Sequence, residues 1–362
     1  MKTRYLLLIF LFPVLVGCHI SGNSLNVPKE IIDLSGYSER PFSEYLSNYQ
    51  SCISSTKIDE SPIFRLGVVD RAHFSDSVIV LRDFRMKRLA AISRHDGHGI
   101  STIGNLGRAE NEYLQISGFD FDVNNDLLVL DARSKKLLKY DGKTFDFIGK
   151  QSLDKNFVDI KCLDDGNYIL YQYPSTKRKS FQLQMTDDKL QSKKEFLPHL
   201  ESSDISSIFT TQSFNPSNSS GFYSSDIFVD DVITEINHSG QIIRQYEIDF
   251  GKYRIPDGIR SSISMHAAEL IKYRSACAPL FISKHILGGR LFNKTALSFF
   301  VADRDNEIVY IPTQDLEQMT LIYCDNEIMA FYVNSEINDS VIRSLCPDLN
   351  VADYIITIKN AR

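Results

Sequence analysis

The stretch GFDFDVNNDLLVLDARSKKLLKYDGKTFDFIGK, residues 118–150, predicts four short strands joined by three tight turns. Phe119, Phe121 and Val123 alternate with acidic residues, which is the period-two pattern of a strand with one buried face. Residues 127–130 are apolar at every position, which indicates a strand packed on both faces. The turns are rich in Asn, Asp and Gly, which tolerate the positive φ angles that hairpins need. The four expected strands are 119–123, 127–131, 136–140 and 145–150.

Units of this kind recur along the chain, and we expect six of them. Four strands in so short a segment are the blade of a β-propeller. The sequence therefore predicts an all-β fold, a six-bladed β-propeller with short helical insertions. The other expected units are 78–104, 157–196, one that ends with 232–248, 280–311 and 320–358.

A propeller ring usually closes when one terminus completes a blade formed by the other, because this removes an open sheet edge. Residues 31–34 or 52–57 could supply the missing outer strand beside 352–358. The sequence leaves both alternatives open.

Three segments interrupt the β pattern. Apolar residues at helical spacing predict an amphipathic helix at 257–274, between the fourth and fifth blades. Residues 340–345 predict a second, short helix that is stopped by Pro347. The composition of NPSNSSG, 215–221, predicts a loop.

The charge balance excludes one class of partner. The chain has 40 Lys and Arg against 46 Asp and Glu, a formal net charge of −6. Binding to a phosphate backbone demands clustered cations, and the one basic run, 177–179, is interpreted as a solvated turn between two strands. We therefore expect no nucleic-acid partner.

The N-terminus has the features of a bacterial lipoprotein signal. Lys2 and Arg4 precede an apolar segment at 5–15, which is too short to span a membrane as a helix. The segment ends in LVGC, which resembles the lipobox in which the cysteine, here Cys18, is acylated, for example with palmitate, and becomes the mature N-terminus. The alternative is a plain secretory signal with an incidental cysteine. The predicted division is a signal peptide at 1–17, a flexible tether at 18–29 and the propeller at 30–362.

Several acyl chains on one residue anchor a protein stably, whereas a single chain anchors it weakly. Lipidation of Cys18 therefore predicts a membrane-attached protein of the cell envelope, at the outer membrane and facing either the periplasm or the outside. Without Cys18, five cysteines remain at irregular spacing and no CxxC pair is present, so we expect neither disulfides nor a zinc site. Cys162 and Cys324 fall within apolar strand patterns and are predicted to be core residues.

Three passages carry a resemblance to a known family: IGNLGRAENEY at 103–113, residues 118–140, and YEIDFGKYRIP at 246–256. Together with the lipobox and the four-stranded units, they resemble the six-bladed β-propeller lipoproteins of Gram-negative gut anaerobes, a family that is itself similar to NHL-repeat propellers. The likeness covers 29–359. It implies architecture and location, because the family has no agreed activity. Ala109 and Asn111 depart from the usual Gly or Pro of the 103–113 connector.

Two local patterns could suggest a metal, and neither predicts one. A DxDxNxD pattern superficially resembles a calcium loop, but its first residues are expected on an extended strand and it lacks the Gly and Glu that such a loop needs. His95 and His98 flank an expected Asp-Gly turn, with no third ligand nearby. The residues of the acidic pattern are Asp120, Asp122, Asn124 and Asp126, and a weaker acidic group at an expected hairpin tip is Asp303, Asp305 and Glu307.

The chain contains no GxSxG, HExxH, Walker or complete GxGxxG motif. We therefore predict no catalytic residues, no metal and no cofactor. Ser77 and Ser340 each stand in an Asp-Ser-Val triplet that resembles a short bacterial O-glycosylation signal, and their modification is a hypothesis.

These observations favour a non-enzymatic, lipid-anchored propeller that presents a binding face for a glycan, a peptide or an envelope protein complex. The connector at 104–113 and the insertion at 257–274 are the first candidates for that face. One rival is a hydrolase or lyase at the channel mouth, using a metal or paired carboxylates, since His residues distant in the chain can gather there. Another rival is a structural subunit of an envelope uptake complex.

Overall fold

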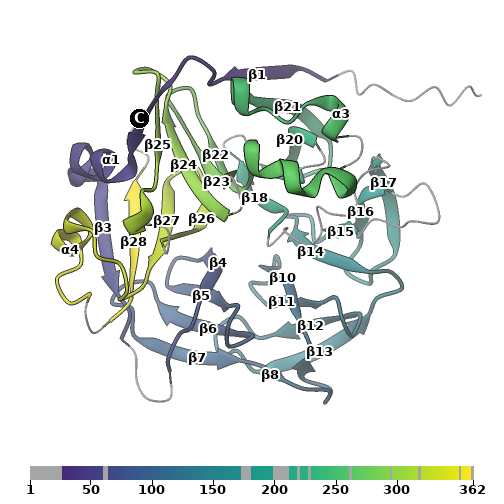
Figure 1. Ribbon diagram of the computed structural model, residues 1–362. Helices are drawn as coiled ribbons and strands as arrows, with labels where there is room; N and C mark the ends of the chain where they lie inside the picture. Colours follow the sequence, from purple (N-terminus) through teal and green to yellow (C-terminus); the bar gives the residue numbers. More distant parts are fainter. Residues whose placement is uncertain are drawn as a thin grey trace, which may run out of the picture.

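Six small, mainly antiparallel sheets are arranged as blades in a ring around a common centre (Figure 1). The computed structural model describes residues 27–59, 64–172, 181–198, 212–217, 221–226, 230–260, 263–293, 296–316, 319–349 and 352–359. The innermost strands β4, β10, β14, β18, β22 and β26 surround the centre (Figure 1). The predicted six-bladed β-propeller is therefore confirmed.

The first three blades each contain four consecutive strands. Blade 1 comprises β4 (Val69–Phe74), β5 (Val78–Asp83), β6 (Arg88–Ser93) and β7 (Gly99–Ile103). Blade 2 comprises β10 (Ile116–Phe121), β11 (Leu127–Asp131), β12 (Lys136–Tyr140) and β13 (Phe147–Ser152). Blade 3 comprises β14 (Phe157–Cys162), β15 (Tyr168–Gln172), β16 (Phe181–Thr186) and β17 (Ser192–Pro198). A two-stranded element, β8 (Asn105–Leu106) and β9 (Glu112–Tyr113), lies in the connector between blades 1 and 2.

The last three blades each take a strand from the N-terminal segment. Blade 4 comprises β18 (Phe214–Ser217), β19 (Gly221–Asp226), β20 (Asp230–Asn237), β21 (Ile242–Asp249) and β1 (Lys29–Asp33). Blade 5 comprises β22 (Arg274–Ile282), β23 (Ile286–Asn293), β24 (Ala296–Asp303), β25 (Ile308–Ile311) and β2 (Ser38–Pro41). Blade 6 comprises β26 (Thr320–Cys324), β27 (Ile328–Val333), β28 (Tyr354–Lys359) and β3 (Ile53–Lys57).

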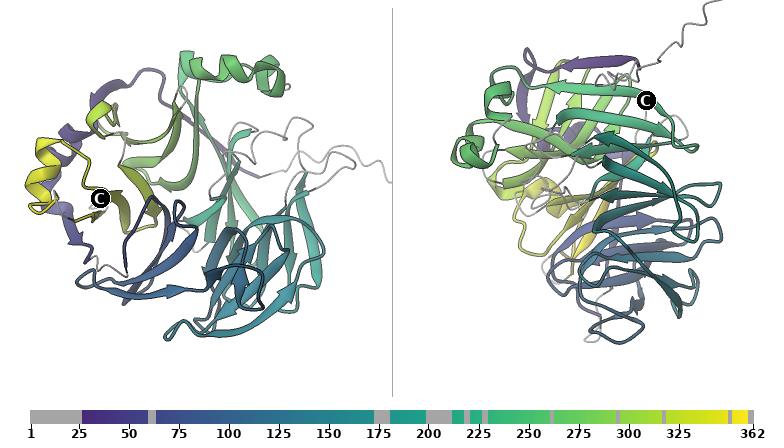
Figure 2. Two further views of the ribbon diagram at one scale, coloured as in Figure 1. Left: turned by 60° about the horizontal axis from the view of Figure 1, so that its bottom comes forward. Right: turned by 90° about the vertical axis from the view of Figure 1, so that its right-hand side faces the viewer.

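Short helical segments lie around the ring, some at its outer edge and those after β21 over one face, as Figures 1 and 2 show. They are α1 (Phe42–Asn48), η1 (Gln50–Cys52), η2 (Gly251–Tyr253), α3 (Asp257–Arg260), η3 (Ile263–Lys272), η4 (Gln314–Leu316) and α4 (Ser340–Leu345). The predicted helix at 340–345 is confirmed, and Asp339 caps it by accepting hydrogen bonds from the backbone N–H groups of Val341 and Ile342.

We name the strands of each blade A to D from the centre outward. Because successive strands run antiparallel, the A–B and C–D turns lie on one side of the ring, which we call the turn face. The B–C turns and the connectors between blades lie on the other side, which we call the connector face.

The hydrophobic core is divided into layers between successive blades. Strand β11 shows why, since its apolar residues alternate between its two faces. Leu127 and Val129 pack with residues of blade 1, whereas Leu128 and Leu130 pack with residues of blade 3. This confirms the prediction of a strand buried on both faces, and comparable layers between the other blades complete the ring.

The N-terminal segment closes the ring in blade 6. Strand β3 pairs antiparallel with β28, with Ser55 opposite Ile356. Of the two strands that could complete the ring, 52–57 is therefore the correct one. Strand β1, which contains the other candidate segment, instead adds to the outer edge of blade 4 in parallel with β21.

Two innermost strands lie where no strand was predicted. The sequence analysis missed β4 because Asp70, Arg71 and His73 break the apolar pattern. In the predicted loop at 215–221, residues 215–217 belong to β18 and Gly221 begins β19, while 218–220 lie outside the described residues. The Asn215 side chain is bonded to the backbone of Leu280 in the next blade. Innermost strands of this kind are hard to predict because their polar side chains form bonds at the centre of the ring, so the strands lack the apolar pattern of a packed layer.

Two boundaries also differ from the prediction. The expected helix at 257–274 consists of two separate segments, α3 and η3, with a non-helical conformation at His266. Strand β22 then begins at Arg274, six residues before the predicted strand. In blade 2, the last strand begins at Phe147 and not at 145, since Phe145 has a φ of 61° and ends the C–D turn.

We expect Phe42→Ala to destabilise the protein by roughly 3–5 kcal/mol, because it empties a fully buried site that joins the N-terminal segment to blades 5 and 6. The Phe42 ring lies 4.8 Å from Phe299 and 5.3 Å from Phe331, centroid to centroid. Urea unfolding measures the change. Phe84→Ala is the control, because Phe84 is 66% exposed and its removal should change stability by less than about 0.5 kcal/mol. Equal effects of the two substitutions would contradict this account of closure.

Candidate functional site

The centre of the ring is crossed by buried charged side chains. Arg71 of β4 donates to the Asp159 carboxylate of β14 at 2.7 Å and to the backbone carbonyl of Phe119 in β10 at 3.1 Å. Arg71 and Asp159 are 5% and 1% exposed. This pair therefore joins blades 1, 2 and 3 away from solvent.

Asp159 also connects blade 4 to this group. Its other carboxylate oxygen accepts hydrogen bonds from the backbone N–H groups of Ser213, at 2.6 Å, and Phe214, at 3.3 Å. Gly118 of β10 leaves room for the carboxylate, because a Cβ at that position would lie 2.4 Å from Asp159 Oδ1. A charge buried in this way is stable only when its lone pairs are satisfied, and here they are.

Two further arginines extend the connections around the ring. Arg82 of β5 forms a two-pronged ion pair with Asp70, at 2.8 Å for both bonds, and donates to the carbonyl of Ser117 in blade 2 at 2.9 Å. Arg290 of β23 donates to the carbonyl of Leu321 in blade 6 at 3.0 Å and to that of Asp70 in blade 1. With Asn215 bonded to Leu280, the polar connections run through all six blades.

At the turn-face end of the centre, Asp120 joins β10 to its neighbours. His73 Nδ1 lies 3.2 Å from one carboxylate oxygen, and Lys161 Nζ lies 2.8 Å from the other, which also accepts the backbone N–H of Cys162. Burial alone would raise the pKa of Asp120, but Lys161 and His73 hold it well below its usual range. The hollow beside these residues has a volume of only about 20 Å³, room for about one water molecule.

We expect Gly118→Ala to destabilise the protein by roughly 1–3 kcal/mol, since the new methyl group would press on Asp159 and on its backbone. Gly149→Ala in the same blade is the matched control, because a Cβ there meets nothing within 4 Å. Thermal unfolding of the two variants measures the difference. If Gly149→Ala were the more damaging of the two, the role assigned to Gly118 would be wrong.

We expect Asp120→Asn to lower stability by roughly 3 kcal/mol at pH 7, because it leaves the Lys161 ammonium buried without its partner. The folded-state pKa of Asp120 is depressed, so its contribution is complete above the pKa of an unfolded-chain carboxyl, about 4, and is lost as the pH falls towards the folded value. The gap between wild type and variant should therefore narrow as the pH is lowered from about 4.

Urea unfolding at several pH values tests this dependence, with Asp154→Asn as the control on an exposed carboxylate. A gap that stays constant from pH 7 to pH 3 would show that the ionised carboxylate of Asp120 is not what stabilises the fold.

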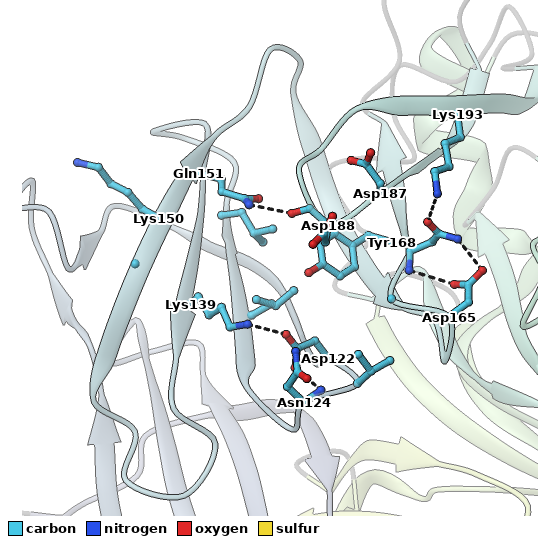
Figure 3. Close-up of a pocket in the computed structure, with 16 residues that line it drawn as sticks. Asp122, Asn124, Lys139, Lys150, Gln151, Asp165, Tyr168, Asp187, Asp188 and Lys193 are labelled. Atoms are coloured by element: carbon cyan, nitrogen blue, oxygen red, sulfur yellow. Dashed lines mark hydrogen bonds and ion pairs between the residues drawn. The ribbon is translucent and has the colours of Figure 1, made fainter.

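A larger hollow lies on the turn face, between blades 2 and 3, and Figure 3 shows its side chains. We call it the blade 2–3 groove. Its volume is about 550 Å³, which is within the range of roughly 300–1,000 Å³ for small-molecule sites. It is lined by Asp122, Val123, Asn124, Leu128, Leu137, Lys139, Gly149, Lys150 and Gln151 of blade 2 and by Asp165, Gly166, Asn167, Tyr168, Asp187, Asp188 and Lys193 of blade 3.

Hydrogen bonds hold the polar side chains of the groove in place. Gln151 Nε2 donates to the backbone carbonyl of Asp188 at 2.8 Å and so links the two walls (Figure 3). Lys139 Nζ lies 2.9 Å from Asp122 Oδ2, and Lys193 Nζ lies 2.5 Å from the Asn167 side-chain oxygen. The groove is therefore preformed.

Tyr168 lies between the two walls of the groove, and its hydroxyl points towards the wall from blade 2 (Figure 3). The residue is only 6% exposed, and burial raises its pKa to about 12. Among the residues that the structure describes, none forms a hydrogen bond with the Tyr168 hydroxyl. The hydroxyl opens into the hollow and can both donate and accept a hydrogen bond, so it is available to a ligand.

A second hollow of about 440 Å³ lies on the same face between blades 4 and 5. Two of its charged side chains are bonded within the protein: Arg304 donates to the carbonyl of Ser283 at 2.7 Å, and Glu235 accepts the Tyr246 hydroxyl at 3.0 Å. Glu30 of β1 also lines it and pairs with Arg304 at 3.4 Å. The ion pair between Glu30 and Arg304 therefore joins the N-terminal strand to blade 5 across this hollow.

Comparison with known proteins identifies the family, because a family profile described as a domain of unknown function, DUF4934, matches residues 30–355. The chain belongs to the DUF4934 family. A search of curated protein sequences gives no match to this DUF4934 chain.

Two crystal structures have a similar fold. A protein from Bacteroides fragilis that is described as exported has a TM-score of 0.68 at 15% identity, covering 92% of this DUF4934 chain and 100% of its own. A member of the DUF4221 family from Bacteroides vulgatus has a TM-score of 0.50 at 10% identity, covering 85% of this chain and 96% of its own. At these identities the likeness concerns the fold alone.

The acidic pattern of this DUF4934 protein is divided between two sites. Asp120 lies at the centre of the ring, whereas Asp122 Oδ1 accepts the backbone N–H groups of Asn124 and Asp126, both at 2.9 Å. Lys139 lies 2.8 Å from Asp126 as well as close to Asp122. These carboxylates thus shape a turn and neutralise a lysine.

The other candidate ligands lie in turns. His98 Nδ1 lies 2.7 Å from Asp96, in a turn where Gly97 has a φ of 75°. Asp303 accepts the backbone N–H groups of Asp305 and Asn306 at 3.1 Å each. Within the described part of the chain, no group of three or more His, Cys, Asp or Glu residues could hold a metal ion.

The two segments that were the first candidates for a binding face both lie on the connector face, opposite the groove. A hydrogen bond stabilises the connector at 104–113, since the Tyr113 hydroxyl donates to the carbonyl of Ile103 at 3.0 Å. The Tyr140 hydroxyl donates to the carbonyl of Asn111, also at 3.0 Å. The connector therefore packs against blade 2. The sequence analysis missed the groove residues, such as Tyr168 and Lys193, because they lie in ordinary strand patterns.

The five described cysteines are free, and Cys162 and Cys324 are buried as predicted. Cys18 lies outside the described residues, as do the basic run at 177–179 and the whole predicted signal peptide. No helix in the described ranges is both long and apolar enough to cross a membrane.

Proposed function

We propose that this chain is a lipid-anchored binding module of the cell envelope, which holds its ligand on the turn face. The observation that carries the proposal is the occupied centre of the ring. Buried ion pairs and hydrogen bonds join the inner strands there, whereas the blade 2–3 groove on the turn face offers about 550 Å³. Binding in the groove needs no rearrangement of the inner strands.

The composition of the groove also favours binding over catalysis. Lys139 and Lys193 are held by carboxylate or amide oxygens at 2.5–2.9 Å, and Lys150 pairs with Glu110 at 3.2 Å, so the lysines act as fixed donors. Activated catalytic groups usually have a base or a metal beside them. The groove instead offers hydrogen-bonding groups in fixed positions, which is the arrangement of a recognition site.

An envelope location is supported by the lipobox at Cys18 and by the fold's likeness to a Bacteroides fragilis protein described as exported. Strand β1 begins at Lys29, on the outer edge of blade 4. Residues 18–28 span at most about 40 Å when fully extended. In this proposal the propeller stays close to the membrane, with the ligand or an envelope protein complex as its partner.

We expect Cys18→Ala to move the protein from the membrane fraction to the soluble fraction in cells, because the variant lacks the sulfur that carries the acyl chain. Fractionation followed by immunoblotting measures the shift. Cys52→Ala is the control and should stay with the membranes, since Cys52 lies beside strand β3 of the propeller. A Cys18→Ala protein that remains in the membrane fraction contradicts lipidation.

The binding function is tested with the mature full-length chain in mild detergent. The protein is incubated with candidate ligands, the bound material is released, and its mass is measured. Recovery of an unchanged ligand supports a binding module. Conversion of the ligand to a product of different mass makes the protein an enzyme and contradicts the proposal.

A hydrolase or lyase at the channel mouth is the second candidate, and one observation favours it. His73 and Asp120 form an imidazole–carboxylate pair, the arrangement that orients a general base. Asp120 is, however, already paired with Lys161, and the hollow beside it has only about 20 Å³. Turnover that disappears in a His73→Ala variant would favour this second function.

A further inference from the structure

The blade 2–3 groove contains a group that the propeller itself does not explain. The Tyr168 side chain is only 6% exposed and its hydroxyl opens into the hollow between the two walls, where no described residue forms a hydrogen bond with it. This hydroxyl can donate and accept a hydrogen bond in the hollow, which a phenylalanine at this position could not do. The hydroxyl therefore points to a ligand that hydrogen-bonds in this hollow.

The charges of the groove do not favour an anionic ligand. Three lysines and four aspartates line it, which gives a formal charge of −1. Lys139 lies between two carboxylates at 2.8 and 2.9 Å, and Lys150 pairs with Glu110 at 3.2 Å. Lys193 is bonded to the neutral Asn167 side-chain oxygen, so a phosphate or sulfate group would find one cation and no cationic cluster.

The remaining surface suits a ligand that both donates and accepts hydrogen bonds and also has apolar faces. Fixed donors and acceptors stand on both walls, with the Asp188 carboxylate beside Tyr168 (Figure 3). Leu128 and Leu137 line the hollow between them, and Val123 at its rim is 53% exposed. Sugar rings combine vicinal hydroxyl groups with apolar C–H faces, and each hydroxyl can donate and accept.

We propose that the blade 2–3 groove binds a short neutral oligosaccharide, with the Tyr168 hydroxyl and the Asp188 carboxylate bonded to sugar hydroxyls. This inference rests on the proposed binding function and adds its site and its ligand class. The polar groups that hold the walls together, such as Gln151, keep the groove open for the ligand.

The experiment uses the mature full-length chain in mild detergent on an array of neutral oligosaccharides, anionic oligosaccharides and short peptides. Binding to neutral members is expected. For the best of them, isothermal titration calorimetry should show about a fivefold to tenfold loss of affinity in Tyr168→Phe, the effect of one neutral hydrogen bond. Asp188→Asn should also weaken binding, since it replaces a charged acceptor.

Tyr140→Phe is the matched control. Its hydroxyl donates to the carbonyl of Asn111 on the connector side of the same blade. Tyr140→Phe should therefore lower thermal stability and leave sugar affinity unchanged. Tyr168→Phe should lower sugar affinity and leave thermal stability unchanged, because its hydroxyl has no partner among the described residues. Thermal unfolding of both variants shows that lost binding is not lost folding.

The possible results separate this inference from the proposed function. Binding only to anionic sugars or only to peptides overturns the ligand class, as does failure to bind any neutral member. Sugar binding that is unaffected by both Tyr168→Phe and Asp188→Asn overturns the site. Each of these results leaves a binding module intact, whereas a bound sugar that is recovered cleaved contradicts the binding function itself.

Discussion

The carboxylate of Asp159 is the constraint on which the centre of this propeller depends. It accepts Arg71 from blade 1 and two backbone N–H groups from the start of blade 4, and Gly118 of blade 2 makes room for it. Ion pairs of this kind are stable in a protein interior only when every charged atom has a partner. The polar connections from Arg82, Arg290 and Asn215 continue around the ring, so the blades are joined at the centre by charge and between their faces by apolar layers.

Because side chains fill the centre of the ring, a binding site of useful size lies elsewhere on the molecule. Many β-propellers enclose a central channel, but here arginines, aspartates and an asparagine from the two innermost strands of the blades bond to one another and to backbone carbonyls at the centre. The roomy hollows on the turn face lie further out, where twisted sheets diverge between neighbouring blades. Between blades 2 and 3 this divergence exposes strand faces whose side chains are polar and fixed, and it leaves one tyrosine hydroxyl without a partner in the described structure.

Prediction succeeded where a local pattern was sufficient. The alternation in β11 and the turn residues around Asn125, whose φ is 61°, identified blade 2 correctly. It failed for β4 and β18, because their polar residues face partners that are distant in the chain: Arg71 meets Asp159 88 residues later, and Asn215 meets Leu280 65 residues later. The groove could not be predicted for the same reason, since Tyr168 resembles any buried strand aromatic until blade 2 is placed beside it.

The sequence by itself determined the fold class, the number of blades and the helix at α4, because strand periodicity, turn chemistry and helix capping act over a few residues. Only the tertiary structure decided which N-terminal strand closes the ring, where the acidic residues of 120–126 are used, and which face is hollowed. These features depend on pairs of residues that ring closure brings together. Asp120 and Asp122 are two residues apart, yet one pairs with Lys161 at the centre and the other with Lys139 in the groove.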